Sequence, residues 1–243
     1  MSTEHHSTAN PDQQGQDRIW EYFQNDAIDS FSMSHGRLDF LLSKLSAGQR
    51  VLNIGVGGGI FEKLAIGQGV EIWSLDPSER AIQRLRDFLG MAERARVGHG
   101  QHMPFDREYF DAVVMSEVLE HLDDDVLTQT LDEVSRVLKP GGVFLGTVPA
   151  EEQLADSNVV CPHCAHQFHR WGHRRSFDAA RMTALLSTKF KPESVHTLFF
   201  IDWRGASLKR KLKGLLQKLL SHYRIGTYGT HRNIYFLARK ISA

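Results

Sequence analysis

Hydrophobic positions change their period near residue 50 of the chain. Between residues 38 and 45, apolar side chains recur at the i, i+3, i+4, i+7 spacing that predicts an amphipathic helix. Beyond residue 50, short apolar runs alternate with helical patterns. The runs predict strands at 51–54, 70–75, 96–99, 110–115 and 143–148, and the patterns between them predict helices at 60–66, 78–89 and 123–138. Such alternation is typical of βαβ units, so we expect an α/β fold with a mostly parallel sheet and helices on both faces.

Both ends of the chain depart from this rhythm. Residues 1–17 contain no large apolar side chain after Met1, which predicts a disordered tail. We expect 18–243 to be a single domain with a helical lid at 18–47 and two inserts, one loop-like at 151–176 and one basic at 204–224. The remaining patterns predict helices at 178–186 and 208–223 and strands at 195–203 and 233–239.

The formal charge is zero, with 29 Lys and Arg against 29 Asp and Glu, which excludes a uniformly basic coat for nucleic acid. The two signs are unevenly spread, however. No acidic residue follows Asp202, and the last 41 residues carry ten Lys and Arg. No apolar run reaches the roughly 18 residues of a membrane span, and no signal peptide opens the chain. We therefore expect a cytoplasmic protein with an acidic body and a basic end.

A glycine-rich turn follows the first predicted strand, in the stretch VLNIGVGGG at 51–59. Glycines at a strand-to-helix turn let the backbone approach a ligand closely, and the following helix N-terminus offers free N–H groups. Asp76 ends the second predicted strand, 21 residues after Gly55, where a carboxylate can accept hydrogen bonds from ribose hydroxyls. The combination predicts a nucleoside site, whereas the glycines alone would also fit a plain tight turn.

Four stretches together resemble the class I S-adenosylmethionine-dependent methyltransferases. They are VLNIGVGGG (51–59), SLDPSERAI (74–82), MPFDREYFDAVVMSEVLEHL (103–122) and RVLKPGG (136–142). The glycine turn of NAD enzymes would need Gly or Ala at position 60, where this chain has Ile60. The resemblance implies a Rossmann-like sheet of seven strands, mostly parallel, with an antiparallel last strand. It also implies an enzyme that takes its methyl group from S-adenosylmethionine.

The resemblance also implies roles for individual positions. The implied cofactor-binding residues are Asn53, Gly55, Gly57, Gly59, Asp76, Pro77, His99, Gly100, Gln101 and Ser116. The three glycines would surround the methionine part, Asp76 would hold the ribose diol, and 99–101 would flank adenine. Two positions depart from the family pattern. Asn53 stands where an acid usually ends the first strand, and His99 stands where an Asp usually accepts from the adenine amino group.

Glu117, Glu120 and His121 follow the fourth predicted strand. If a helix begins there, positions i, i+3 and i+4 share one face and offer two carboxylates and an imidazole to a divalent ion such as Mg or Mn. The cluster resembles the E-x-x-E-H site of small-RNA 2′-O-methyltransferases and ubiquinone-pathway O-methyltransferases. In the first family a later histidine completes the set, and His173 fits that place. Alternatively, the glutamates simply favour the helix dipole.

Both cysteines of the chain lie in one C-x₂-C knuckle. Cys161 and Cys164, followed by His169 and His173, supply four ligands at the short spacing of a structural zinc site. If His173 serves the catalytic ion instead, His166 could be the fourth zinc ligand. The alternatives are a disulfide or redox pair and two unliganded thiols.

The most favoured function is therefore O-methylation of a hydroxylated small molecule or glycan. The acceptor could be linked to a lipid, and a divalent metal could assist the reaction. Methylation of RNA ribose and a non-catalytic cofactor-binding module are the alternatives. The basic helix at 208–223 has a leucine stripe opposite its lysines, which is typical of peripheral contact with an anionic membrane. The same pattern would also fit a helix that caps the sheet. Nucleic acid is the less favoured partner, because few aromatic residues accompany the basic ones.

Overall fold

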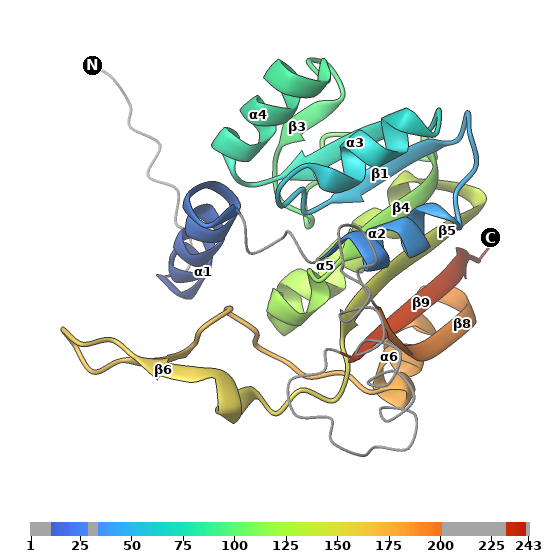
Figure 1. Ribbon diagram of the computed structural model, residues 1–243. Coiled ribbons are helices and arrows are strands. Elements are labelled where there is room, and N and C mark those ends of the chain that lie inside the picture. The colour runs from blue at the N-terminus through green and yellow to red at the C-terminus, as the bar shows by residue number, and fades with distance from the viewer. Residues whose placement is uncertain (1–10, 29–33, 201–231, 242–243) are drawn as a thin grey trace, which may run out of the picture.

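The computed structural model describes residues 11–28, 34–200 and 232–241 (Figure 1). Seven strands form a central sheet in the order β3-β2-β1-β4-β5-β9-β8. They are β1 (Arg50–Ile54), β2 (Glu71–Asp76), β3 (Ala95–Val97), β4 (Phe110–Ser116), β5 (Leu138–Pro149), β8 (Phe190–Phe199) and β9 (Arg232–Lys240). The pairs among β1 to β5 are parallel, and β9 is antiparallel to both of its neighbours. The predicted sheet with an antiparallel last strand is confirmed.

Helices cover both faces of the sheet, as Figure 1 shows. The described helices are α1 (Pro11–Glu21), the π-helical turn η1 (Tyr22–Asp26), α2 (His35–Leu42), α3 (Ile60–Gly67), α4 (Glu79–Leu89), α5 (Asp124–Val137) and α6 (Ala179–Leu186), and those from α2 to α6 form the layers on the sheet. Short 3-10 turns lie at η3 (Leu119–His121) and η4 (Leu154–Ser157). None of the described helices is long and apolar enough to cross a membrane.

Alternation of side chains along the central strands divides the core into two clusters. Leu52 on β1 packs with residues of α5 and α6, whereas the adjacent Val51 packs with residues of α2, α3 and α4. Successive residues of a strand point to opposite faces, so a run that is apolar at every position predicts a strand buried on both faces. This explains why β1, β2 and β4 lie within a residue or so of their predicted bounds.

The N-terminal prediction is wrong for residues 11–17, which belong to α1 rather than to a disordered tail. Hydrophobicity misses this helix because polar groups help to hold it: Gln16 Nε2 lies 3.2 Å from His121 Nδ1. Figure 1 shows α1 outside the helical layers that cover the sheet.

Three later predictions also need correction. The 151–176 insert contains a two-stranded hairpin, β6 (Asn158–Val160) with β7 (Gln167–His169), rather than loop alone. Strand β8 begins at Phe190, earlier than predicted, because the buried Phe190 ring packs on Phe144. Strand β5 begins at Leu138, which pairs with Phe110. The basic segment 204–224, with its helix at 208–223, lies outside the described residues.

Candidate active site

The glycine-rich turn joins β1 to α3 and needs glycine for steric reasons. Gly55, Gly57 and Gly59 all have positive φ angles, of 86°, 49° and 78°. A Cβ at Gly55 would lie 2.6 Å from Val118 Cγ2, and one at Gly59 would lie 2.8 Å from Leu85 Cδ2. The turn therefore has no side chains at these glycines, and its backbone is accessible from a cavity at the carboxyl ends of the strands.

Asp76 lies at the end of β2 and is 1% exposed. Its carboxylate accepts the backbone N–H of Val56 at 2.9 Å and that of Ser78 at 2.8 Å, and the side-chain amide of Gln24 at 3.0 Å. Burial raises the pKa of Asp76, while these hydrogen bonds oppose the rise. The carboxylate is thus held in one orientation as an acceptor in the cavity wall.

A first cavity brings most of the predicted cofactor residues together. Gly55, Asp76, Pro77, His99, Gly100 and Gln101 line it. A second, adjoining cavity is lined by Asn53, Gly57 and Ser116, and Gly59 is not among the lining residues of either. The two cavities share one wall, which is formed by Trp20, Gly55, Val118 and His121. The two cavities therefore meet at Gly55, where the glycine-rich turn begins, and at η3.

Two carboxylates that sequence reasoning missed stand beside the unusual residues Asn53 and His99. Asn53 Nδ2 donates to Glu62 Oε1 at 2.7 Å, and burial raises the pKa of Glu62 to about 7. Asp17 of α1 lines the first cavity together with His99. Burial raises the pKa of Asp17, while His99 opposes the rise. Acids are thus present near both positions, but they come from other elements of the fold.

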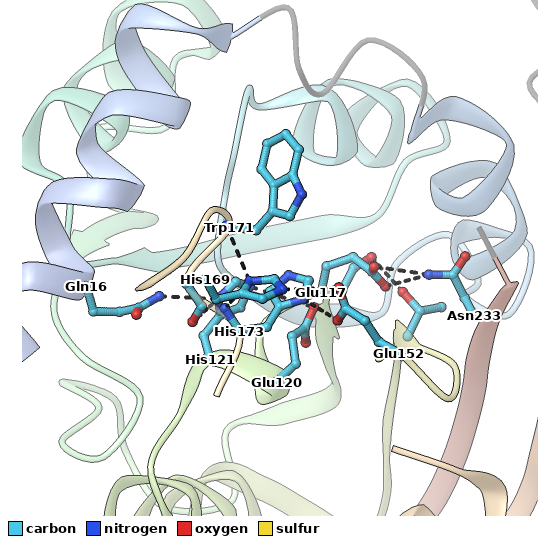
Figure 2. Close-up of polar contacts among 12 residues, drawn as sticks. Gln16, Glu117, Glu120, His121, Glu152, His169, Trp171, His173 and Asn233 are labelled. Carbon is cyan, nitrogen blue, oxygen red and sulfur yellow. Dashed lines mark hydrogen bonds and ion pairs between the residues drawn. The ribbon is translucent and has the colours of Figure 1, made fainter. Parts of the chain in front are cut away.

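Glu120, His121 and His173 form a cluster beside the shared wall (Figure 2). Each offers a ligand atom, and these atoms lie within 4.8 Å of one another. Both oxygens of Glu120 are buried without a hydrogen-bond partner, and burial with the nearby Glu117 charge raises the pKa of Glu120. Burial lowers the pKa of His121, which keeps its imidazole neutral. A buried carboxylate without a hydrogen bond, next to two imidazoles, fits a divalent transition metal ion.

Glu117 does not join this cluster, which corrects the predicted set of four ligands. Its φ angle is 58°, and η3 after it is a single 3-10 turn, so no helical face carries positions i, i+3 and i+4. Asn233 Nδ2 instead donates to both carboxylate oxygens of Glu117 at 3.0 Å, and Arg37 Nη1 lies 3.8 Å from one of them. Figure 2 shows Glu117 turned toward Asn233.

Glu152 is a site residue that the sequence does not predict. It follows β5, and its carboxylate forms a second group with His169 and His173 in which the ligand atoms lie within 4.8 Å. Glu152 and His173 also line the second cavity, with aromatic side chains of Trp20, Phe23 and Trp171. An acid next to another acid after a strand gives no distinctive sequence pattern, so only the fold reveals this residue.

Comparisons with known proteins identify the family of the chain. A family model described as a methyltransferase domain matches residues 28–190. A ubiquinone biosynthesis O-methyltransferase of Xanthomonas oryzae pv. oryzae is 32% identical over 182 residues, which cover 70% of this chain and 74% of that protein. The chain belongs to the S-adenosylmethionine-dependent methyltransferase family.

Solved structures show the same fold. A chain in the complex of the Haloferax volcanii Trm112 methyltransferase activator with a methyltransferase matches at a TM-score of 0.67 and 18% identity, covering 92% of this chain and 98% of that one. Burkholderia thailandensis 1,6-didemethyltoxoflavin-N1-methyltransferase, solved with S-adenosylhomocysteine, matches at 0.64 and 17%, covering 97% and 92%. The family model and the Xanthomonas oryzae relative support an enzyme whose methyl donor is S-adenosylmethionine, as the sequence predicts.

The Cys/His insert of the methyltransferase does not assemble the predicted zinc ligands. His169 and His173 lie with Glu152, and among the described residues no group of three ligands includes a cysteine. Cys161 and Cys164 are free thiols, and the His166 ring stacks on Phe168. The hairpin accounts for the separation, because β7 places His169 opposite Asn158 and directs the following turn toward η3.

Proposed function

We propose that this methyltransferase transfers the methyl group of S-adenosylmethionine to a hydroxyl oxygen of a small molecule or glycan. We further propose that Glu120, His121 and His173 hold a divalent metal ion during the reaction. The observation that carries the metal site is the pair of Glu120 oxygens, both buried and both without a hydrogen bond, with His121 Nε2 3.7 Å from one of them. Isolated buried carboxylates are costly, and in proteins they are usually paired or bound to a metal.

Oxygen as the acceptor atom is supported by the relatives. The Xanthomonas oryzae protein is named as an O-methyltransferase, and so is a relative from Aromatoleum aromaticum that is 33% identical over 108 residues. The second cavity supports a small acceptor, because aromatic side chains and polar groups line it side by side, as in sites for small molecules. Such a cavity suits a ring that carries hydroxyl groups.

The residues of the chain divide the work between the two cavities. The glycine-rich turn and Asp76 bind the methyl donor, and Trp20 lines both cavities where they adjoin. A bound divalent ion supplies Lewis acidity, which lowers the pKa of a hydroxyl group. The neutral imidazole of His121 is available as a ligand, because burial disfavours its protonation. Alignment of the acceptor with the sulfonium methyl then follows from the shape of the shared wall.

The test is methyl transfer to a panel of hydroxylated small molecules, together with metal analysis of the purified protein. We expect activity that chelation abolishes and that added Mn²⁺ or Mg²⁺ restores. Glu120→Ala and His173→Ala should lose both metal and activity, while Glu93→Ala, at an exposed position, should keep both. Undiminished activity of metal-free enzyme and of Glu120→Ala would overturn the metal site. Methylation of nitrogen or carbon acceptors alone would overturn O-methylation.

RNA ribose methylation is the second candidate, favoured by the same metal cluster and by the basic segment 208–223. That segment lies outside the described residues, as does the proposed contact with an anionic membrane. An RNA oligonucleotide in the acceptor panel tests ribose methylation. Flotation with anionic liposomes tests the membrane contact. Peripheral membrane binding, the lid role of 18–47 and a cytoplasmic location remain proposals on the sequence pattern.

A further inference from the structure

Each carboxylate oxygen of Glu152 lies close to a nitrogen of one imidazole ring. His173 Nδ1 lies 2.5 Å from one oxygen, and His169 Nε2 lies 3.4 Å from the other. The side chains are 20% exposed for Glu152, 12% for His173 and 5% for His169, so solvent has little access to these contacts. Figure 2 shows the three residues together, with His121 and Glu120 beside them.

Backbone hydrogen bonds determine which nitrogen of His169 carries its proton. The backbone N–H of His173 donates to His169 Nδ1 at 3.0 Å, and that of Trp171 approaches the same nitrogen at 3.4 Å. A nitrogen that accepts a hydrogen bond is unprotonated, so in the neutral ring Nε2 carries the hydrogen. That N–H faces Glu152. At 3.4 Å, His169 Nε2 is within ion-pair distance of the Glu152 carboxylate but forms no hydrogen bond with it.

We propose that Glu152 is the positioning residue of the active site and that it sets the tautomer of His173. The carboxylate accepts a hydrogen bond from Nδ1–H of His173, which leaves the lone pair on Nε2. Ligating histidines commonly donate their other N–H to a carboxylate in this way, which orients the ring and raises its basicity as a ligand. The inference rests on the proposed function in one respect, that His173 binds the ion held with Glu120 and His121.

The neighbouring rings restrict His173 further. His169 stacks on it with ring centroids 4.6 Å apart and 22° between the planes, and His121 meets it edge-on with centroids 4.6 Å apart. These two ring contacts, together with the short contact to Glu152, favour one orientation of the His173 ring. Glu152 thus reaches the shared wall through His173, without being a ligand itself.

The direct test is nitrogen-15 NMR of the histidine rings in full-length, metal-free protein, under alkaline conditions where the imidazoles are neutral. We expect His173 as the Nδ1–H tautomer in the wild type, with His173→Gln used for assignment. In Glu152→Gln the tautomer should shift toward Nε2–H, and Glu152→Asp should restore part of the wild-type pattern. An Nε2–H tautomer in the wild type, or an unchanged tautomer in Glu152→Gln, would overturn the inference.

Metal binding gives a second readout, with Mn²⁺ alone as the probe. Glu152→Gln should weaken Mn²⁺ binding by about 10–100-fold. Glu151→Gln is the matched control, because the adjacent Glu151 pairs with Arg232 and should leave the affinity unchanged. Equal affinities for Glu152→Gln and wild type would overturn the inference. If the wild type binds no Mn²⁺ the proposed metal site fails, and the tautomer spectrum, which needs no metal, still decides the role of Glu152.

Discussion

The side-chain amide of Gln24 donates a 3.0 Å hydrogen bond to the Asp76 carboxylate and so joins η1 to the end of β2. Both side chains are almost fully buried, at 2% and 1% exposure. The oxygen that accepts Gln24 also accepts the N–H of Val56 in the glycine-rich turn. One carboxylate therefore connects the N-terminal helices, the turn and the sheet at the wall of the cofactor cavity.

Removal of this contact should loosen α1 and η1. A hydrogen bond to a charged group contributes about 1.5–3 kcal/mol, so Gln24→Ala should make local opening of 11–28 about tenfold or more frequent. Hydrogen exchange of those amides measures the change. Gln83→Ala, which removes an exposed contact with Asp87 on α4, is the matched control. Unchanged exchange in Gln24→Ala would mean that other contacts hold the helices in place.

A methyl group on the glycine-rich turn should abolish cofactor binding. Gly55→Ala places an L side chain at a φ of 86° and a Cβ 2.6 Å from Val118 Cγ2. The backbone conformation alone costs roughly 1–2 kcal/mol, and calorimetric titration with S-adenosylhomocysteine should show greatly weakened binding. Gly67→Ala, where no atom lies within 4 Å of the added methyl, should bind normally. Partial recovery in the double variant with Val118→Ala would show that the clash contributes.

Stability should depend on pH through Glu62. Burial raises the pKa of this carboxyl from 4.5 to about 7 in the folded protein. The folded state then keeps a proton that the unfolded state has lost, so the free energy of unfolding falls as pH rises from 4.5 to about 7. Glu62→Gln removes this dependence. Compared with that variant, the wild type should lose about 3 kcal/mol across the window, since each pKa unit corresponds to about 1.4 kcal/mol.

Urea unfolding at the two ends of this window measures the effect, with Glu93→Gln as an exposed control. If the free energies of unfolding of the wild type and Glu62→Gln differ by the same amount at both pH values, the raised pKa of Glu62 is contradicted. The ordinary case of an acid with a lowered pKa gives the opposite slope, so the sign of the change is itself diagnostic.

The two cysteines should differ in reactivity. Backbone N–H groups of Cys164 and His163, with the Cys164 side chain, lower the pKa of the Cys161 thiol. A larger thiolate fraction reacts faster with alkylating agents. Brief treatment with iodoacetamide at neutral pH, followed by peptide mass spectrometry, should label Cys161 ahead of Cys164. Protection of both thiols, relieved by a chelator, would instead indicate a bound zinc ion.

The sequence contains enough information for the parts of the site that one strand and its turn create. Gly55 directly follows β1 and Asp76 is the last residue of β2, and parallel strands bring such ends to one edge of the sheet. Their proximity follows from local pattern and fold class alone. The positions after β4 were predicted less well, because a left-handed Glu117 and a 3-10 turn replace the helix that the spacing of Glu117, Glu120 and His121 suggests.

The remaining site residues depend on contacts between elements that are distant in the chain. Gln24 meets Asp76 across 52 positions, and Asn233 meets Glu117 across 116. A polar residue that docks in this way has no periodicity to reveal it, and α1 as a whole lacks the apolar stripe of a core helix. Glu152 similarly depends on the path of the hairpin that returns His169 and His173 to η3. Tertiary packing, rather than local preference, selects these residues.

Trp20 lies in the wall of both cavities and meets the His121 ring edge-on, with centroids 4.3 Å apart. A displacement of this one indole changes the surroundings of the methyl donor and of the acceptor together. If a ligand in either cavity displaces Trp20, the resulting coupling is reciprocal, and each ligand alters the affinity for the other by the same factor.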